Sequence, residues 1–198
     1  MSTDQIDRAA VAMVLGEPLG DAVIDGQAEL DPVHVPGMES TVVWRVRDES
    51  ADHPWQVYVG RWPNGDVRVL TDDQDAWADL VAATGVHLAD AGQALAYVES
   101  YLEVTRGAMV IVLPIRSLDE LRWRPGSPDE EEAKTHLLAA PPDVERVAEA
   151  KGKGFHVALT LVVDQRLQRN EFEIAADGQV LKSSFEVLAE RLPLPIAR

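Results

Sequence analysis

The chain has 198 residues, with 34 acidic side chains against 18 basic ones and a formal net charge of −16 at pH 7. It has no cysteine, which excludes thiol catalysis, disulfide scaffolds and thiolate-held zinc or iron–sulfur sites. The negative charge argues against nucleic-acid binding, and no apolar run reaches the roughly 18–20 residues that a membrane span needs. Residues 1–5 lack the basic and apolar regions of a signal peptide, so we expect a cytoplasmic protein.

The charge is unevenly distributed along the chain. Residues 1–107 carry 19 acidic and 6 basic side chains, whereas residues 108–198 carry 15 and 12. Two interpretations stay open. The acidic half can reflect a bacterial type of acidic composition that keeps the protein soluble, or it can form an anionic face that attracts a basic partner.

The first half begins with a predicted helix over residues 4–14, whose apolar side carries Ile6, Ala9, Ala10, Met13 and Val14. Alternating apolar residues then predict three strands, over 41–47, 55–62 and 67–70. The last two are separated by Pro63-Asn64-Gly65-Asp66. An Asn-Gly pair between alternating apolar runs is a strong hairpin signal.

Two capping boxes predict the next helices. Thr71 with Gln74 begins a helix that ends at Gly85, and Asp90 with Gln93 begins a longer one that ends near residue 105. We expect the first to bury Trp77, Leu80 and Val81. In the second, the expected apolar stripe is Leu95, Val98 and Leu102, with Tyr97, Tyr101 and Val104 beside it.

The second half starts with the nearly continuous apolar run 109–115, which is typical of a strand covered on both faces. Capping and first-turn residues predict helices over 127–139 and 142–152. Strands are expected over 155–163, 171–175 and 180–187, the last two joined by the turn Asp177-Gly178. The tail Leu192-Pro193-Leu194-Pro195 is expected to be extended and to cover a sheet edge.

This order of elements predicts an α+β fold in which antiparallel β-meanders pack against helices. The two halves, 1–107 and 108–198, are loosely similar and form either two domains or one compact domain. The final helix and meander, with the Asp177-Gly178 turn, resembles cystatin-like and nuclear-transport-factor-like cones. That resemblance concerns architecture alone and transfers no function.

The search for chemistry yields one weak candidate. No two of the five histidines have the i, i+4 spacing of a helical metal site, and no phosphate-binding loop occurs. We therefore expect no metal and no cofactor. His156 lies on the strand face opposite Phe155 and Val157, where it could form an acid–base pair with Glu171 or Glu173. The alternative is a solvated histidine of the sheet.

Two aromatic positions are candidates for binding. Trp62 either lies exposed beside its hairpin or packs over the turn. Arg122, Trp123 and Arg124 combine residue types that dominate binding hot spots, although Trp123 can equally be a core residue whose flanking arginines pair with acids.

Three functions remain after these exclusions. The preferred one is a non-catalytic interaction protein (chaperone-like, immunity-type or a regulatory adaptor) that binds a basic protein through its acidic surface. The alternative is a small-molecule-binding or hydrolase/isomerase-like pocket protein that uses His156 with Glu171 or Glu173. A third is a structural subunit whose exposed strand edges pair in a homodimer. Neither nucleic acid nor membrane is expected as a partner.

Overall fold

The structure is a computed structural model, and it describes residues 6–40, 42–49, 54–107, 110, 112–121, 123, 130–139, 145–149, 154–192 and 194. The chain divides into two compact units. Unit 1 comprises Met1–Ala108 and Ala176–Gln179, and unit 2 comprises Met109–Ala175 and Val180–Arg198. Helices and antiparallel strands in both units confirm the predicted α+β class. Within the described residues, every helix is too short or too polar to cross a membrane.

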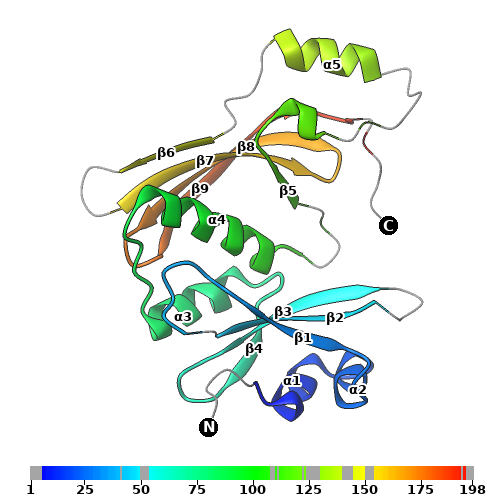
Figure 1. Cartoon of the computed structure of the whole chain (residues 1–198), viewed down its shortest axis with the longest axis vertical. Helices are drawn as coiled ribbons and strands as arrows, with labels where there is room; N and C mark the ends of the chain where they lie inside the picture. The colour runs from blue at the N-terminus through cyan, green and yellow to red at the C-terminus, as the bar shows by residue number, and fades with distance from the viewer. Residues whose placement is uncertain are drawn as a thin grey trace. The chain divides into compact units, whose positions relative to one another are not determined.

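Unit 1 is built around a four-stranded antiparallel sheet, sheet 1 (Figure 1). Its strand order is β1 (Glu29–Val33), β2 (Val43–Asp48), β3 (Trp55–Arg61) and β4 (Val67–Val69). Helices α1 (Arg8–Leu15) and α2 (Leu19–Ile24) cover one face, and α3 (Gln74–Thr84) and α4 (Ala91–Thr105) cover the other (Figure 1). The sequence predicted β2, β3, β4, α3 and α4, whereas β1 and α2 were missed.

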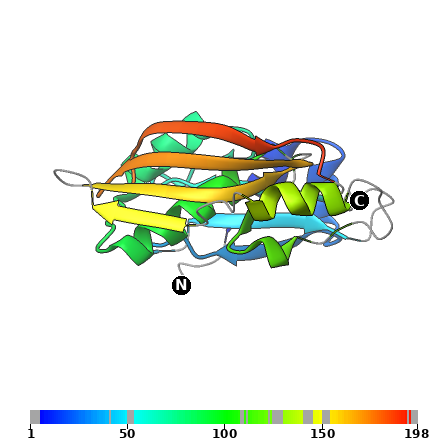
Figure 2. The ribbon, with the colours of Figure 1, turned by 90° about the horizontal axis from the view of Figure 1, so that it is seen from above.

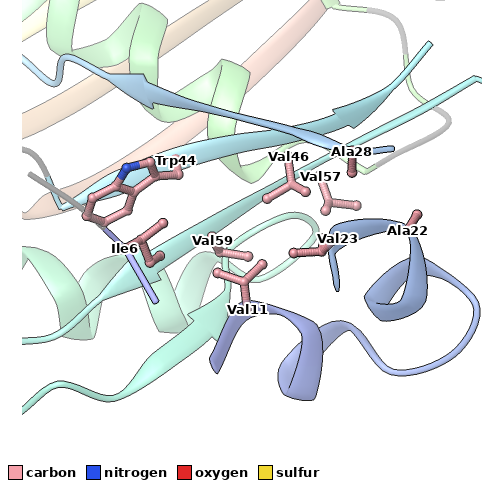
Figure 3. Packing of buried hydrophobic residues seen from close by; sticks show 9 residues of the cluster. All are labelled: Ile6, Val11, Ala22, Val23, Ala28, Trp44, Val46, Val57 and Val59. Carbon is pink, nitrogen blue, oxygen red and sulfur yellow. The ribbon is translucent and has the colours of Figure 1, made fainter. Parts of the chain in front are cut away.

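One apolar cluster of unit 1 lies between sheet 1 and the pair α1–α2. Trp44 and Val46 of β2 point to this side of the sheet, whereas the partly buried Arg45 and Arg47 point to its other face. Figure 3 shows the side chains of Val11 and Val23 pointing from the helices toward the strand residues. The buried cluster comprises Ile6, Val11, Ala22, Val23, Ala28, Trp44, Val46, Val57 and Val59.

The predicted inner side of the first helix is wrong. The helix begins at Arg8, because Asp7 is its N-cap and accepts a hydrogen bond from the Ala9 N–H at 2.9 Å. Val11 is 0% exposed, whereas Met13 is 80% exposed. Both stripes have helical spacing, so periodicity could not choose between them. The contact with α2 determines which side of the helix faces inward, since the backbone of Ala12 lies against Gly20 of α2.

The cap of α3 also differs from the prediction. Asp73, not Thr71, is the N-cap and accepts from the Ala76 N–H at 2.8 Å. Thr71 instead accepts from the Tyr58 N–H at 2.7 Å, which ties the start of α3 to β3. Gly85 ends the helix in the left-handed conformation as predicted.

Helix α4 begins after Asp90, as its capping box predicts, but buries a different stripe from the expected one. Leu95 and Leu102 are only partly buried. The buried residues are Ala94, Tyr97, Val98, Tyr101, Val104 and Thr105. Hydrogen bonds to a buried polar group explain why the helix presents this side to the core. The Tyr97 hydroxyl accepts from the Trp77 indole at 3.0 Å and donates to the Gly178 carbonyl at 2.7 Å, so burying it leaves no unpaired polar atom.

Unit 2 contains a five-stranded antiparallel sheet, sheet 2, made of β5 (Val112–Ile115), β6 (Glu145–Glu149), β7 (Gly154–Val163), β8 (Arg166–Ala175) and β9 (Val180–Ala189). β7, β8 and β9 are neighbours in this order, and both β5 and β6 pair with β7. A short 3-10 helix η1 (Leu118–Glu120) and α5 (Glu130–Ala139) complete the unit. Leu192 and Leu194 of the predicted apolar tail are buried in a cluster with Ile115, Leu121, Leu137, Val162 and Leu167.

Two predictions for unit 2 are wrong. The predicted helix over 142–152 is a strand where it is described: β6 pairs with Phe155–Leu159 of β7. Its sequence Glu-Arg-Val-Ala-Glu does not alternate as a strand would, so the pairing with the edge of β7 and not the local pattern makes it a strand. The strand near 109–115 is not covered on both faces, because Leu113 of β5 is 53% exposed.

The tyrosines give a test of this packing at alkaline pH. Burial raises the pKa of all three tyrosine hydroxyls, Tyr58, Tyr97 and Tyr101, and the neighbouring carboxylate of Glu103 raises that of Tyr58 further. In the unfolded chain the tyrosine pKa is about 10. The free energy of unfolding should therefore be unaffected by these groups below pH ~10 and fall as the pH rises above it.

Tyrosinate absorbance measured against pH checks this expectation. The folded chain should ionise its tyrosines well above the pH at which the same chain does so in concentrated urea. Coincident titrations of the two forms would contradict the buried arrangement.

The contact between α1 and α2 gives a second test. A Cβ at residue 20 would collide with the carbonyl oxygen of Ala12, so Gly20→Ala should lower the free energy of unfolding by about 1–3 kcal/mol. Without that collision, alanine in a helix is more stable than glycine by about 1 kcal/mol. Gly92→Ala is the matched control, since Gly92 is also the second residue of its helix and its added Cβ meets only Asp90 Oδ1 at 3.3 Å. Urea unfolding of the two variants should give opposite signs, and equal stabilities would refute the close packing.

Candidate functional site

The most distinctive surface of unit 1 lies on the outer side of α1 and α2. Between Arg8 and Arg45 the sequence has no lysine or arginine, although it has six acidic residues. Three of them, Glu17, Asp21 and Asp25, belong to the segment that forms α2 and its approach, and all three are exposed. We call the exposed side chains of residues 13–25 the α1–α2 surface.

Exposed apolar side chains lie within the same surface. Met13 is 80% exposed and Ile24 is 58% exposed. Asp21 and Ile24 are three residues apart on α2, so they are neighbours on one helix face. Large apolar side chains that stay in water beside polar ones are typical of sites where proteins bind each other.

The α1–α2 surface owes its exposure to the residues that face inward. Val11 and Val23 are fully buried beneath it, and the close contact of Ala12 with Gly20 holds the two helices together. Arg8 donates to the carbonyl oxygens of Val23 near the end of α2, at 3.1 Å, and of Ala28 just before β1, at 3.4 Å.

The acids of sheet 1 have a different environment. Arg47 contacts Glu29 at 2.9 Å, Asp31 at 3.2 Å and Glu49 at 2.7 Å, and Arg45 contacts Asp31 at 3.0 Å. The pairs with Glu29 and Asp31 connect β1 to β2, whereas Glu49 lies two residues beyond Arg47 in the chain. A partner's cation would therefore have to compete with these arginines, although Glu29 and Glu49 are themselves exposed.

Other carboxylates of unit 1 also serve the fold. Asp7, Asp73 and Asp90 cap helices, and Glu103 accepts a hydrogen bond from the Tyr58 hydroxyl at 2.5 Å. Asp79 lies 3.6 Å from Arg68. The acidic residues of the first half thus include a group that makes contacts within the fold, and a group on the α1–α2 surface for which no ion pair is found among the described residues.

In unit 2, the three residues of the predicted acid–base group lie on one face of sheet 2. His156 is directly across from Glu173 in the register of β7 and β8, and His156 Nε2 lies 3.8 Å from Glu171 Oε2. That separation is longer than a hydrogen bond. Each carboxylate already has a cation nearby: Arg169 Nε is 3.2 Å from Glu171, and Lys182 Nζ is 3.8 Å from Glu173.

This arrangement is an ion-pair row on a sheet, and its chemistry is limited by the contacts it makes. A general base must reach the proton it removes at about 2.6–3.2 Å. Glu171 would have to turn away from Arg169 before it could orient the His156 imidazole. The role of His156, Glu171 and Glu173 in catalysis stays a prediction.

The two tryptophans that were candidates for binding are both covered by cations. Trp62 is 7% exposed, and the Arg68 guanidinium carbon lies 4.6 Å from its ring centroid. Trp123 packs partly buried against the apolar cluster of unit 2, with Lys134 Nζ 5.6 Å from its ring centroid. Arg122 and Arg124 lie outside the described residues. Whether these four residues bind a partner stays a prediction.

Comparison with known proteins finds no matching family model, no matching curated protein and no matching solved structure.

Sequence reasoning missed the residues of the α1–α2 surface as a site. The signal was present, because the stretch from residue 9 to residue 44 without a lysine or arginine can be read directly from the sequence. The pattern alone does not show a surface, because the periodicity places Met13 on the inner side of its helix and gives no signal for α2. A run of acidic residues can be recognised as an exposed surface only when the orientation of the helix is known.

Proposed function

We propose that this chain is a non-catalytic, cytoplasmic interaction protein that binds a basic protein through the α1–α2 surface. The observation that carries the proposal is the combination of exposed Glu17, Asp21 and Asp25 with exposed Met13 and Ile24 on one helix pair. Apolar contacts supply most of the binding free energy of such a surface. The carboxylates steer a basic partner toward it and suppress wrong partners.

The net charge also favours a basic partner over an acidic one. At −16, the chain repels acidic proteins and nucleic acids at long range, and the repulsion is screened beyond about 10 Å at moderate salt. The partner is expected to present lysines or arginines around an apolar centre. A chaperone-like, immunity-type or adaptor role would each use such contacts.

Charge reversal on the surface tests the proposal. The triple variant E17K/D21K/D25K should bind the partner about tenfold more weakly or worse, because each substitution turns attraction into repulsion. Affinity capture on the immobilised full chain, followed by mass spectrometry at low and high salt, measures the loss. The wild-type chain should retain basic proteins at low salt and release them at high salt.

A second triple variant separates a local site from a general effect of net charge. D75K/E132K/E190K changes the net charge by the same amount at exposed positions outside the α1–α2 surface. This control variant should still bind the same proteins. The difference between the two triple variants then measures the contribution of the α1–α2 surface. If both triple variants lose binding equally, or if the wild-type chain captures nothing at low salt, the proposed site is wrong.

One observation favours a second candidate function. The folding of β7 and β8 brings His156 to 3.8 Å from Glu171, which is the pairing that a small hydrolase or isomerase would use. Activated ester substrates test this candidate. His156→Asn should abolish any turnover, whereas the exposed His87→Asn should leave it unchanged. Turnover that survives both substitutions would remove His156 from consideration.

A further inference from the structure

Strand β9 ends sheet 2 with a free edge of unusual length. Figure 2 shows β9 as the outermost strand, on the side of β8 away from β7. Among the described residues, no strand pairs with its outer side. Phe185 is 63% exposed and Leu181 is 60% exposed on this ten-residue strand. We propose that β9 pairs antiparallel with β9 of a second copy, which joins two sheets into one across a two-fold axis.

The edges of sheet 1 make the contrast clear. Edge strand β4 has only three residues, and edge strand β1 carries Pro32 near its centre. Short length and proline both prevent a further strand from adding to an edge. β9 has no proline. The bulges in its pairing with β8 lie near its two ends, so the stretch from Lys182 to Val187 is regular.

Symmetry limits the possible registers. A two-fold axis perpendicular to the sheet keeps each side chain on its own face, and residues directly opposite each other in a strand pair share a face. Opposite residues must therefore differ by an even number in the sequence, so that one residue lies opposite its own symmetry mate at the axis. With the axis at Ser184, Lys182 of each copy lies opposite Glu186 of the other. With the axis at Ser183 or Phe185, Lys182 lies opposite Ser184 or Leu188 instead. The Ser184 register alone among these three pairs the charges.

The neighbouring strands extend this complementarity. Within one chain, Glu173 is opposite Lys182 and Arg169 is opposite Glu186. In the Ser184 register, the row across four strands therefore alternates in sign: Glu173, Lys182, then Glu186 and Arg169 of the second copy. The same row occurs twice in the dimer, related by the two-fold axis. Opposite charges directly across a strand pair stabilise it.

The other face of β9 gains apolar contacts in the same register. Phe185 lies opposite Ser183 of the second copy, and the Cα atoms of the two Phe185 residues are diagonal neighbours about 7–8 Å apart, a distance that aromatic side chains can span. The pairing thus reduces the exposure of Phe185, the most exposed large apolar side chain of β9.

Two single charge reversals test the pairing on the full chain. K182E places two glutamates opposite each other at both ends of the paired stretch, and E186K places two lysines there. Each variant should dimerise roughly tenfold or more weakly than the wild type in sedimentation equilibrium. An equimolar mixture of the two should restore the dimer, because every position 182 then faces an opposite charge at position 186.

The mixture is an internal control for folding. Each variant carries the same change within its own chain whether it is alone or mixed, so recovered association reports contacts between copies. A mixture that stays as monomeric as its components, or a wild-type chain that is monomeric over a roughly hundredfold range of concentration, overturns the proposal.

Cysteine cross-linking tests the register. The chain has no cysteine of its own, so Ser184→Cys introduces a single thiol. At the two-fold axis, the Cα atoms of two residues 184 lie about 4.5–5.5 Å apart, within the range of a disulfide. Ser183→Cys is the matched control on the adjacent exposed position, whose symmetry mate is a diagonal neighbour. Under mild oxidation Ser184→Cys should form the covalent dimer at least roughly tenfold faster, and equal rates would refute the register.

This inference does not rest on the proposed function. The E17K/D21K/D25K variant should dimerise like the wild type, and K182E should retain binding of a basic partner through the α1–α2 surface. The experiments can therefore show that one proposal is wrong without affecting the other.

Discussion

The close approach of α1 and α2 determines which side chains of the N-terminal segment reach solvent. Gly20 allows the α2 backbone to contact Ala12, and this fixes the rotation of both helices over sheet 1. Val11 and Val23 then fill the core, while Met13 and Ile24 must remain outside. The exposed apolar residues are thus a consequence of packing a short helix pair, and they are available for a partner because the core has no room for them.

Carboxylates have two separate physical roles in unit 1. Near arginine or a helix N-terminus they are locally compensated, as with Asp31 beside Arg45 and Asp73 at the start of α3. Where no ion pair is found among the described residues, as for the exposed Glu17, Asp21 and Asp25, their potential extends into solvent. Net charge alone does not distinguish these roles, because a capping aspartate and an uncompensated one contribute equally to it. The structure distinguishes them, because it shows which carboxylates lie beside a cation or a helix N–H group.

Local signals were sufficient wherever a cap or a turn fixed the backbone. Asp90, Gly85 and the Asn64-Gly65 turn gave correct element boundaries, and the class α+β followed from their order. Tertiary partners decided the rest. Residues 145–149 became a strand because β7 offered an edge, and α1 turned toward a glycine that the sequence did not mark as a contact. The candidate surface could be read as a charge pattern, but its exposure could not be predicted without that rotation.

Edge pairing and heterologous docking also differ in what symmetry allows. A contact through a two-fold axis uses the same patch on both copies and closes after one step, so it forms a dimer and not a fibre. The α1–α2 surface is used once per chain, and a dimer would therefore present two copies of it. A partner with two basic sites would then bind the second at a raised effective concentration, whereas a partner with a single site would gain nothing. Dimerisation through β9 would accordingly select among basic partners by their valence, a property that neither surface has alone.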